Sequence, residues 1–227
     1  MKETTFERDL PQGYKVGGVI DASQGKLAVM PTVLSVISLF IAIGLLYLPF
    51  ILDPNSVRFD IRLGENRLPY YAVALALTVV YVILHELVHG AVYKMHTGEK
   101  LTYGFAQTCA YCGVPKIFTY RKTAIAAVLT PFALFTLMLV PTLVVCYLFN
   151  AGLYLAFGIV FAIHLSTCSD DLYVAFLFLT KYKDNRTLMN GTGPKVAFFV
   201  PTDAEEFDED TASFLKQKRI EELKNRR

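Results

Sequence analysis

The chain has 227 residues, of which 54% are hydrophobic and 19% are charged, and its formal net charge is +2. The charged share is below the roughly 25% usual for soluble domains, and the plentiful apolar residues exclude a wholly disordered chain. So small a net charge argues against a nucleic-acid partner, and none is expected. The composition leaves either one membrane domain or one unusually apolar soluble domain.

Four apolar stretches are long enough to cross a bilayer, which requires about 20 residues. They cover residues 30–52, 69–93, 123–149 and 152–180. The preceding segment, 1–29, is polar, mixed in charge and without the apolar core of a cleaved signal peptide. We interpret it as a cytoplasmic N-terminal segment.

The polar segment 96–120 is rich in Tyr, Thr and Phe, which predicts short strands or a hairpin. Residues 196–200 predict one further strand. The predicted fold class is therefore an all-α membrane protein with four transmembrane helices, a small β-like cytoplasmic loop and a tail strand. Residues 30–200 form the predicted membrane domain, and residues 201–227 form a charged cytoplasmic tail.

Lysine and arginine are distributed unevenly around the four spans. The N-terminal segment, the loop after the second span and the whole segment after the fourth span (181–227) together carry 19 of them, whereas the loop after the first span carries 3. The positive-inside rule then places both termini in the cytoplasm. The chain is thus expected to be a multi-pass protein of the cell membrane, with the lipid bilayer as one partner.

The second span ends in His85-Glu86-Leu87-Val88-His89, an H-E-x-x-H sequence in an otherwise apolar helix. The i, i+4 spacing places both imidazoles on one helix face, where they can share a zinc ion. Glu86 lies about 100° round the helix, near enough to take a proton from a water molecule at the metal. Each ionisable residue in a span costs about 2.5–3.5 kcal/mol on insertion scales. We interpret His85 and His89 as zinc ligands and Glu86 as the general base; the alternative is a buried polar trio that bonds to neighbouring helices.

A catalytic zinc usually has three protein ligands, and the last span offers Asp170 and Asp171. His85 lies nine residues before Lys94, and Asp171 lies ten before Lys181. At 1.5 Å per residue, both lie roughly 14 Å from the cytoplasmic end of their helix. This match in depth supports one of the two aspartates as the third ligand.

Asp171 is the preferred third ligand, and Asp170 is the alternative. His164 and Asp171 are seven residues apart and share nearly the same helix face, so both turn inward together. Asp170 would then point about 100° away, as a hydrogen-bonding partner of a ligand histidine. For His164, a hydrogen bond between helices is favoured over a role as a ligand or substrate contact.

Thr130-Pro131 lies at a similar depth in the third span. Proline inside a helix frees a backbone carbonyl and kinks the helix. The freed backbone either opens space for water and substrate beside the metal or only adjusts packing elsewhere. Both interpretations remain open.

The H-E-x-x-H sequence resembles that of the zincin membrane peptidases, a family of small four-span proteins that are distantly similar to the site-2 proteases. The resemblance continues in Cys109-Ala-Tyr-Cys112, in Thr130-Pro131-Phe132 and in Asp170-Asp171-Leu172, and covers roughly residues 64–200. It implies zinc on the two histidines, Glu86 as base and an aspartate of the last span as ligand. Site-2 proteases carry glycine after that aspartate, whereas Leu172 follows Asp171 here.

Together these observations predict a zinc-dependent, membrane-embedded metallopeptidase that hydrolyses peptide bonds of a membrane protein or peptide. A first alternative is a non-catalytic zinc-binding membrane protein that binds clients or serves as an accessory subunit. A second is a membrane haem protein in which His164 and one of the other two histidines ligate iron. The haem alternative accounts for neither Glu86 nor the paired aspartates.

Overall fold

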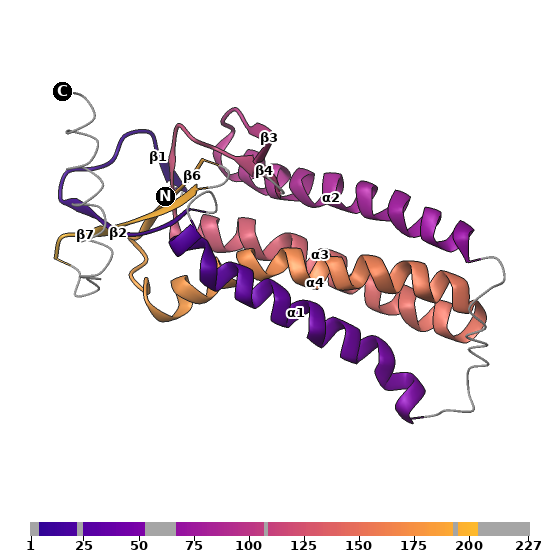
Figure 1. Cartoon of the computed structure of the whole chain (residues 1–227). Coiled ribbons are helices and arrows are strands. Elements are labelled where there is room, and N and C mark those ends of the chain that lie inside the picture. Colours follow the sequence, from indigo (N-terminus) through magenta and orange to yellow (C-terminus); the bar gives the residue numbers. More distant parts are fainter. Residues whose placement is uncertain (1–4, 22–24, 53–66, 107–108, 193–194, 204–227) are drawn as a thin grey trace, which may run out of the picture. The chain divides into compact units, whose positions relative to one another are not determined.

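The computed structural model describes residues 5–21, 25–52, 67–106, 109–192 and 195–203 (Figure 1). Its four helices are α1 (Gly25–Leu52), α2 (Leu68–Thr97), α3 (Arg121–Phe149) and α4 (Ala151–Thr180). They confirm the four predicted apolar helices to within five residues at either end. All four contain segments long and apolar enough to cross a membrane.

The connection between α3 and α4 is as short as the sequence predicts. Asn150 alone separates the two helices. Its backbone N–H donates to the carbonyl of Cys146 (2.8 Å) at the end of α3, and its side-chain oxygen accepts from the N–H of Leu153 (3.0 Å). An asparagine that satisfies an otherwise unpaired N–H of the first turn is a favoured N-cap. One residue thus ends one helix and starts the next.

Two antiparallel sheets accompany the helices. The five-stranded sheet has the order β1-β5-β6-β7-β2, and the hairpin pairs β3 with β4. The strands are β1 (Phe6–Glu7), β2 (Tyr14–Asp21), β3 (Thr102–Ala106), β4 (Cys109–Gly113), β5 (Phe118–Tyr120), β6 (Leu188–Gly191) and β7 (Lys195–Pro201). The predicted strands between the second and third spans and the predicted tail strand are therefore confirmed.

The structure contains more β-sheet than the predicted all-α fold class implies. The N-terminal segment contributes two strands, β1 and β2, that the sequence analysis did not predict. The first has only two residues, and the second contains Gly17 and Gly18, a residue type that weakens a strand. Pairing with β7 from Tyr14↔Pro201 to Asp21↔Lys195 compensates for this low local preference.

The chain divides into two compact units. The first comprises residues 1–29, 90–127 and 174–227, and the second comprises residues 30–89 and 128–173. The first unit contains the strands and a core in which the Tyr182 ring stacks on Phe198 (4.5 Å between centroids). Phe178 meets the same Phe198 ring edge to face (5.2 Å).

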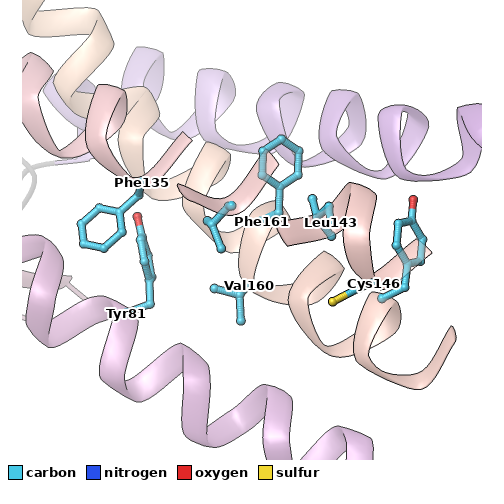
Figure 2. Close-up of a cluster of buried hydrophobic side chains, with 8 residues drawn as sticks. Tyr81, Phe135, Leu143, Cys146, Val160 and Phe161 are labelled. Atoms are coloured by element: carbon cyan, nitrogen blue, oxygen red, sulfur yellow. The ribbon is translucent and has the colours of Figure 1, made fainter. Parts of the chain in front are cut away.

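The second unit holds most of the four helices and an apolar cluster of its own (Figure 2). The cluster consists of Tyr81, Phe135, Leu139, Leu143, Cys146, Tyr154, Val160 and Phe161. Most of its members come from α3 and α4. Burial of these side chains supplies the main packing between α2, α3 and α4 in this unit.

Within this unit, α4 contacts each of the other three helices. The Ser166 hydroxyl lies 2.7 Å from that of Ser35 on α1, and the Tyr154 hydroxyl donates to the Leu46 carbonyl of α1 (2.7 Å). His164 lies within hydrogen-bond distance of Tyr81 on α2 and of Thr136 on α3. The last helix is therefore held at several depths, which fixes the position of the polar residues it carries.

Candidate metal centre

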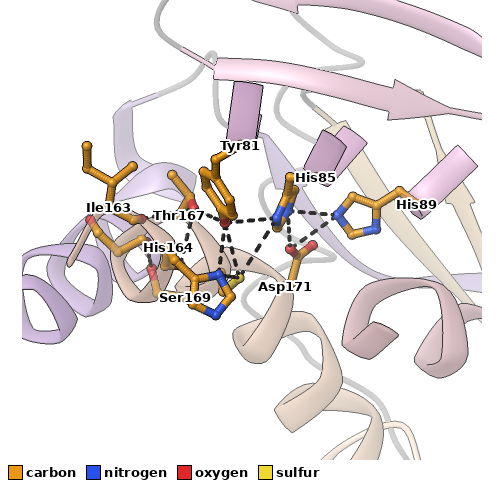
Figure 3. A network of polar contacts seen from close by, with 10 residues as sticks. Tyr81, His85, His89, Ile163, His164, Thr167, Ser169 and Asp171 are labelled. Carbon is orange, nitrogen blue, oxygen red and sulfur yellow. Dashed lines mark hydrogen bonds and ion pairs between the residues drawn. The ribbon is translucent and has the colours of Figure 1, made fainter. Parts of the chain in front are cut away.

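Three side chains from α2 and α4 converge inside the second unit (Figure 3). The Nε2 atoms of His85 and His89 lie 3.1 Å apart. The Oδ2 atom of Asp171 lies 3.3 Å from each of them. Among the described residues, these three form the group of histidine and carboxylate side chains that could hold a metal ion.

The shape of this triangle suits zinc. Tetrahedral coordination with bonds of about 2.0–2.1 Å requires ligand atoms about 3.3–3.4 Å apart. The observed separations of 3.1, 3.3 and 3.3 Å lie close to that value. Two imidazole nitrogens and one carboxylate oxygen are also a donor set that zinc accepts in catalytic sites. Three electron-rich atoms so close together need a cation or a proton between them.

The three side chains of the triangle are largely buried. His85 and His89 are buried, with 6% and 8% of their surfaces exposed. The Phe135 ring of α3 stacks over His85 (centroids 6.3 Å apart, planes at 18°). The Asp171 side chain keeps 19% of its surface exposed. The aspartate is therefore the least enclosed of the three side chains.

The two adjacent aspartates have different environments. Asp171 faces both histidines, whereas Asp170 is exposed and lies outside the metal-binding group. The i, i+7 relation between His164 and Asp171 places both on the inner side of α4, as their shared spacing predicts. The structure thus brings Asp171 to the motif, and Asp170 to the surface of its helix.

Glu86 follows His85 directly on α2 and is half-buried. It is not one of the three converging side chains. A residue one position from a ligand on a helix lies about 100° round the axis, beside the metal-facing side rather than on it. This is the position that a base, as opposed to a ligand, occupies in an H-E-x-x-H helix.

Tyr81 and Thr136 belong to the polar network of this site, and neither was predicted from the sequence. The Tyr81 hydroxyl lies 3.0 Å from Nδ1 of His85 and 3.0 Å from Nδ1 of His164. The other ring nitrogen of His164 lies 2.9 Å from the Thr136 hydroxyl. The sequence does contain one indication of the Tyr81–His85 contact. Tyr81 lies four residues before His85 and so shares its helix face.

The hydrogen-bond contacts of His164 argue against the alternative of a haem protein. Both ring nitrogens of His164 are within hydrogen-bond distance of protein hydroxyls, those of Tyr81 and Thr136. His164 is fully buried in this arrangement. Neither nitrogen of His164 faces open space where an iron ion could be ligated.

Thr130 and Pro131 lie on α3, one turn before Phe135. Pro131 is fully buried, and Thr130 is half-buried. The i, i+4 relation places Pro131 on the same face of α3 as Phe135, which contacts the His85 ring. Their participation in substrate binding stays a prediction.

Gly90 directly follows the second histidine of the motif, and its lack of a side chain has a steric reason. A Cβ atom at this position would collide with the hydroxyl of Tyr103 in strand β3 and would crowd a methyl group of Leu101. Glycine therefore leaves room for the Tyr103 side chain beside this turn of α2, and a larger residue would displace it.

Two histidines of an H-E-x-x-H sequence on one apolar helix and an aspartate of another thus form a group that could hold a metal ion. Residues 78–185 match the family model described as "Putative zincin peptidase", which confirms the family resemblance over that segment. The matched segment contains all three converging side chains as well as Glu86 and His164. Searches of curated proteins and of solved structures found no match.

Proposed function

We propose that the chain is a zinc-dependent metallopeptidase embedded in the membrane, which hydrolyses peptide bonds in or near the bilayer. The observation that carries the proposal is the triangle of His85, His89 and Asp171, with edges of 3.1, 3.3 and 3.3 Å between apolar helices. The match to a zincin family supports the same reaction class. The substrate is a membrane protein or peptide.

The chemical roles follow from the donor set. His85 and His89 would hold a zinc ion as neutral imidazoles, and Asp171 would hold it as a carboxylate. When bound, zinc would supply a Lewis acid that polarises a carbonyl and lowers the pKa of water toward about 7. Glu86 accepts a proton from the attacking water and passes it to the leaving amine. The water oxygen thereby bonds to the acyl carbon as the C–N bond breaks.

The proposal includes insertion in the cell membrane with both termini in the cytoplasm. Outward-facing residues of the four helices are largely apolar, and many large ones are exposed, such as Phe40, Leu75, Leu137 and Leu179. Large exposed apolar surfaces of this kind are typical of sites that contact a membrane or another protein. The ionisable side chains of the site face the interior instead, as is usual for functional groups in membranes.

The decisive experiment compares wild type with Glu86→Gln in liposomes that contain a mixed set of synthetic single-span peptides. Cleavage in water enriched in heavy oxygen is followed by mass spectrometry, because hydrolysis places the label in the new carboxylate. We expect labelled products from wild type, none from Glu86→Gln, and equal zinc content in both. Glu99→Gln, which alters a carboxylate paired with Arg8, is the matched control and should cleave normally.

Full activity of Glu86→Gln would contradict the assignment of the base. Stoichiometric zinc without cleavage of any peptide by wild type would favour the non-catalytic alternative, a zinc-binding subunit that binds clients.

A further inference from the structure

The buried hydroxyl of Tyr81 connects the candidate zinc ligand His85 to His164, and nothing in the proposed reaction uses it. It lies 3.0 Å from Nδ1 of each histidine and 3.1 Å from the Thr167 hydroxyl. Tyr81 is 4% exposed and His164 is fully buried, so water does not substitute for these partners. Figure 3 shows the phenol between the two imidazoles.

The orientation of His85 determines which of its nitrogens needs a proton. Its Nε2 atom points to His89 and Asp171, so a metal there requires a free electron pair on Nε2. A neutral imidazole then carries its proton on Nδ1. The Nδ1–H group then donates to the Tyr81 oxygen at 3.0 Å, which is much nearer than the Cys168 sulfur at 4.0 Å.

Two proton arrangements satisfy the rest of the network. In one, Tyr81 donates to Nδ1 of His164, and Nε2–H of His164 donates to Thr136. In the other, His164 donates to Tyr81, Thr136 donates to His164, and Tyr81 donates to Thr167. The phenol oxygen accepts from His85 in both arrangements, since a hydroxyl accepts two hydrogen bonds and donates one.

We propose that Tyr81, held in place by His164 and Thr136, is a positioning residue that fixes the metal-binding tautomer and the ring orientation of His85. The inference rests on the proposed zinc site. Hydrogen bonds to the remote nitrogen of a ligand histidine commonly contribute 10–100-fold to metal affinity. Here the partner is a neutral phenol that three helices hold, rather than a carboxylate.

The test is zinc affinity of the detergent-purified protein, measured by competition with a chelator. Tyr81→Phe keeps the ring but removes the hydroxyl, and we expect it to weaken zinc binding about 10–100-fold. Tyr154→Phe is the matched control, since it removes a buried hydroxyl of the same apolar cluster that bonds to the Leu46 carbonyl instead. Its zinc affinity should equal that of wild type.

A spectroscopic readout separates positioning from general stability. With Co²⁺ in place of zinc, the visible bands report the geometry of the ligands. They should shift in Tyr81→Phe and remain unchanged in Tyr154→Phe. Thr136→Val removes the hydroxyl that contacts His164. It should also weaken zinc binding, by a smaller factor than Tyr81→Phe. Thr136→Val serves as the test variant if Tyr81→Phe does not fold.

The outcomes distinguish the two proposals. Zinc that binds wild type, is lost in His85→Ala and is unaffected in both Tyr81→Phe and Thr136→Val would overturn the positioning role but keep the metal site. Absence of zinc binding in folded wild type after reconstitution would overturn the proposed function and, with it, this inference.

Discussion

At the scale of single residues, the site depends on which of two adjacent carboxylates turns inward. Asp171 lies 3.3 Å from both histidine nitrogens, whereas the neighbouring Asp170 is exposed. The two side chains have the same chemistry and differ only in direction. Their substitution therefore separates the effect of position from the effect of charge.

We expect Asp171→Asn to lower zinc affinity by more than about 100-fold, beyond the loss typical of a partner outside the ligand set. An amide is a weaker zinc ligand than a carboxylate, because it carries no negative charge. Asp170→Asn should retain zinc near one ion per chain. Metal content by mass spectrometry checks both, and equal loss in the two variants would contradict the assignment.

At the scale of elements, close approaches at glycine fix how the helices pack. Gly152 on α4 lies under the ring of Tyr70 on α2, so a Cβ atom there would collide with the ring. Gly44 on α1 has open space where a Cβ atom would be. The two positions thus differ in packing although both lie in apolar helices.

Gly152→Ala should destabilise the protein by about 1–3 kcal/mol, the usual cost of overpacking. Gly44→Ala should be neutral or stabilising by up to about 1 kcal/mol, because alanine favours helix over glycine. Thermal unfolding in one detergent compares them. A Gly152→Ala variant as stable as Gly44→Ala would mean that helix packing at Gly152 is looser than the geometry implies.

The pairing of β1 with β5 includes a titratable contact outside the four spans. The Tyr120 hydroxyl donates to Glu7 (2.8 Å), and burial together with this hydrogen bond raises the pKa of Tyr120 to about 12. A raised pKa means that the folded state favours the neutral phenol. Its stabilisation is complete below the ordinary pKa of 10 and is lost as the pH rises through about 12.

We therefore expect wild type to lose stability more steeply between these pH values than Tyr120→Phe, which has no proton to lose. Thermal unfolding at a series of alkaline pH values measures the difference. Parallel pH curves for the two proteins would show that the Tyr120–Glu7 contact does not affect folding.

At the scale of the whole molecule, charge distribution predicts how the chain crosses the membrane. With 19 basic residues on one side and 3 on the other, both termini should lie in the cytoplasm. A fluorescent protein fused to either terminus should therefore fluoresce, and alkaline phosphatase fused there should be inactive. The same phosphatase inserted into the loop that follows the first span should be active. Active phosphatase at either terminus would invert the topology.

The four helices could be predicted from the sequence because long apolar runs are a property of consecutive residues. The pairing of the two histidines of H-E-x-x-H was equally predictable, since the i, i+4 spacing alone brings His85 and His89 to one helix face. The strands β1 and β2 were not predictable in this way. Gly17 and Gly18 weaken the local signal, and the pairing partner β7 lies more than 170 residues later in the chain.

The sequence by itself thus determined the apolar helices, the histidine pair and the restriction of the third ligand to Asp170 or Asp171. Only the tertiary structure placed Asp171 against the histidines and brought Tyr81, His164 and Thr136 together from three helices. The physical reason is that the two kinds of information act over different distances along the chain. Periodicity sets which face of its own helix a side chain occupies, whereas packing between helices decides which faces meet and at what depth.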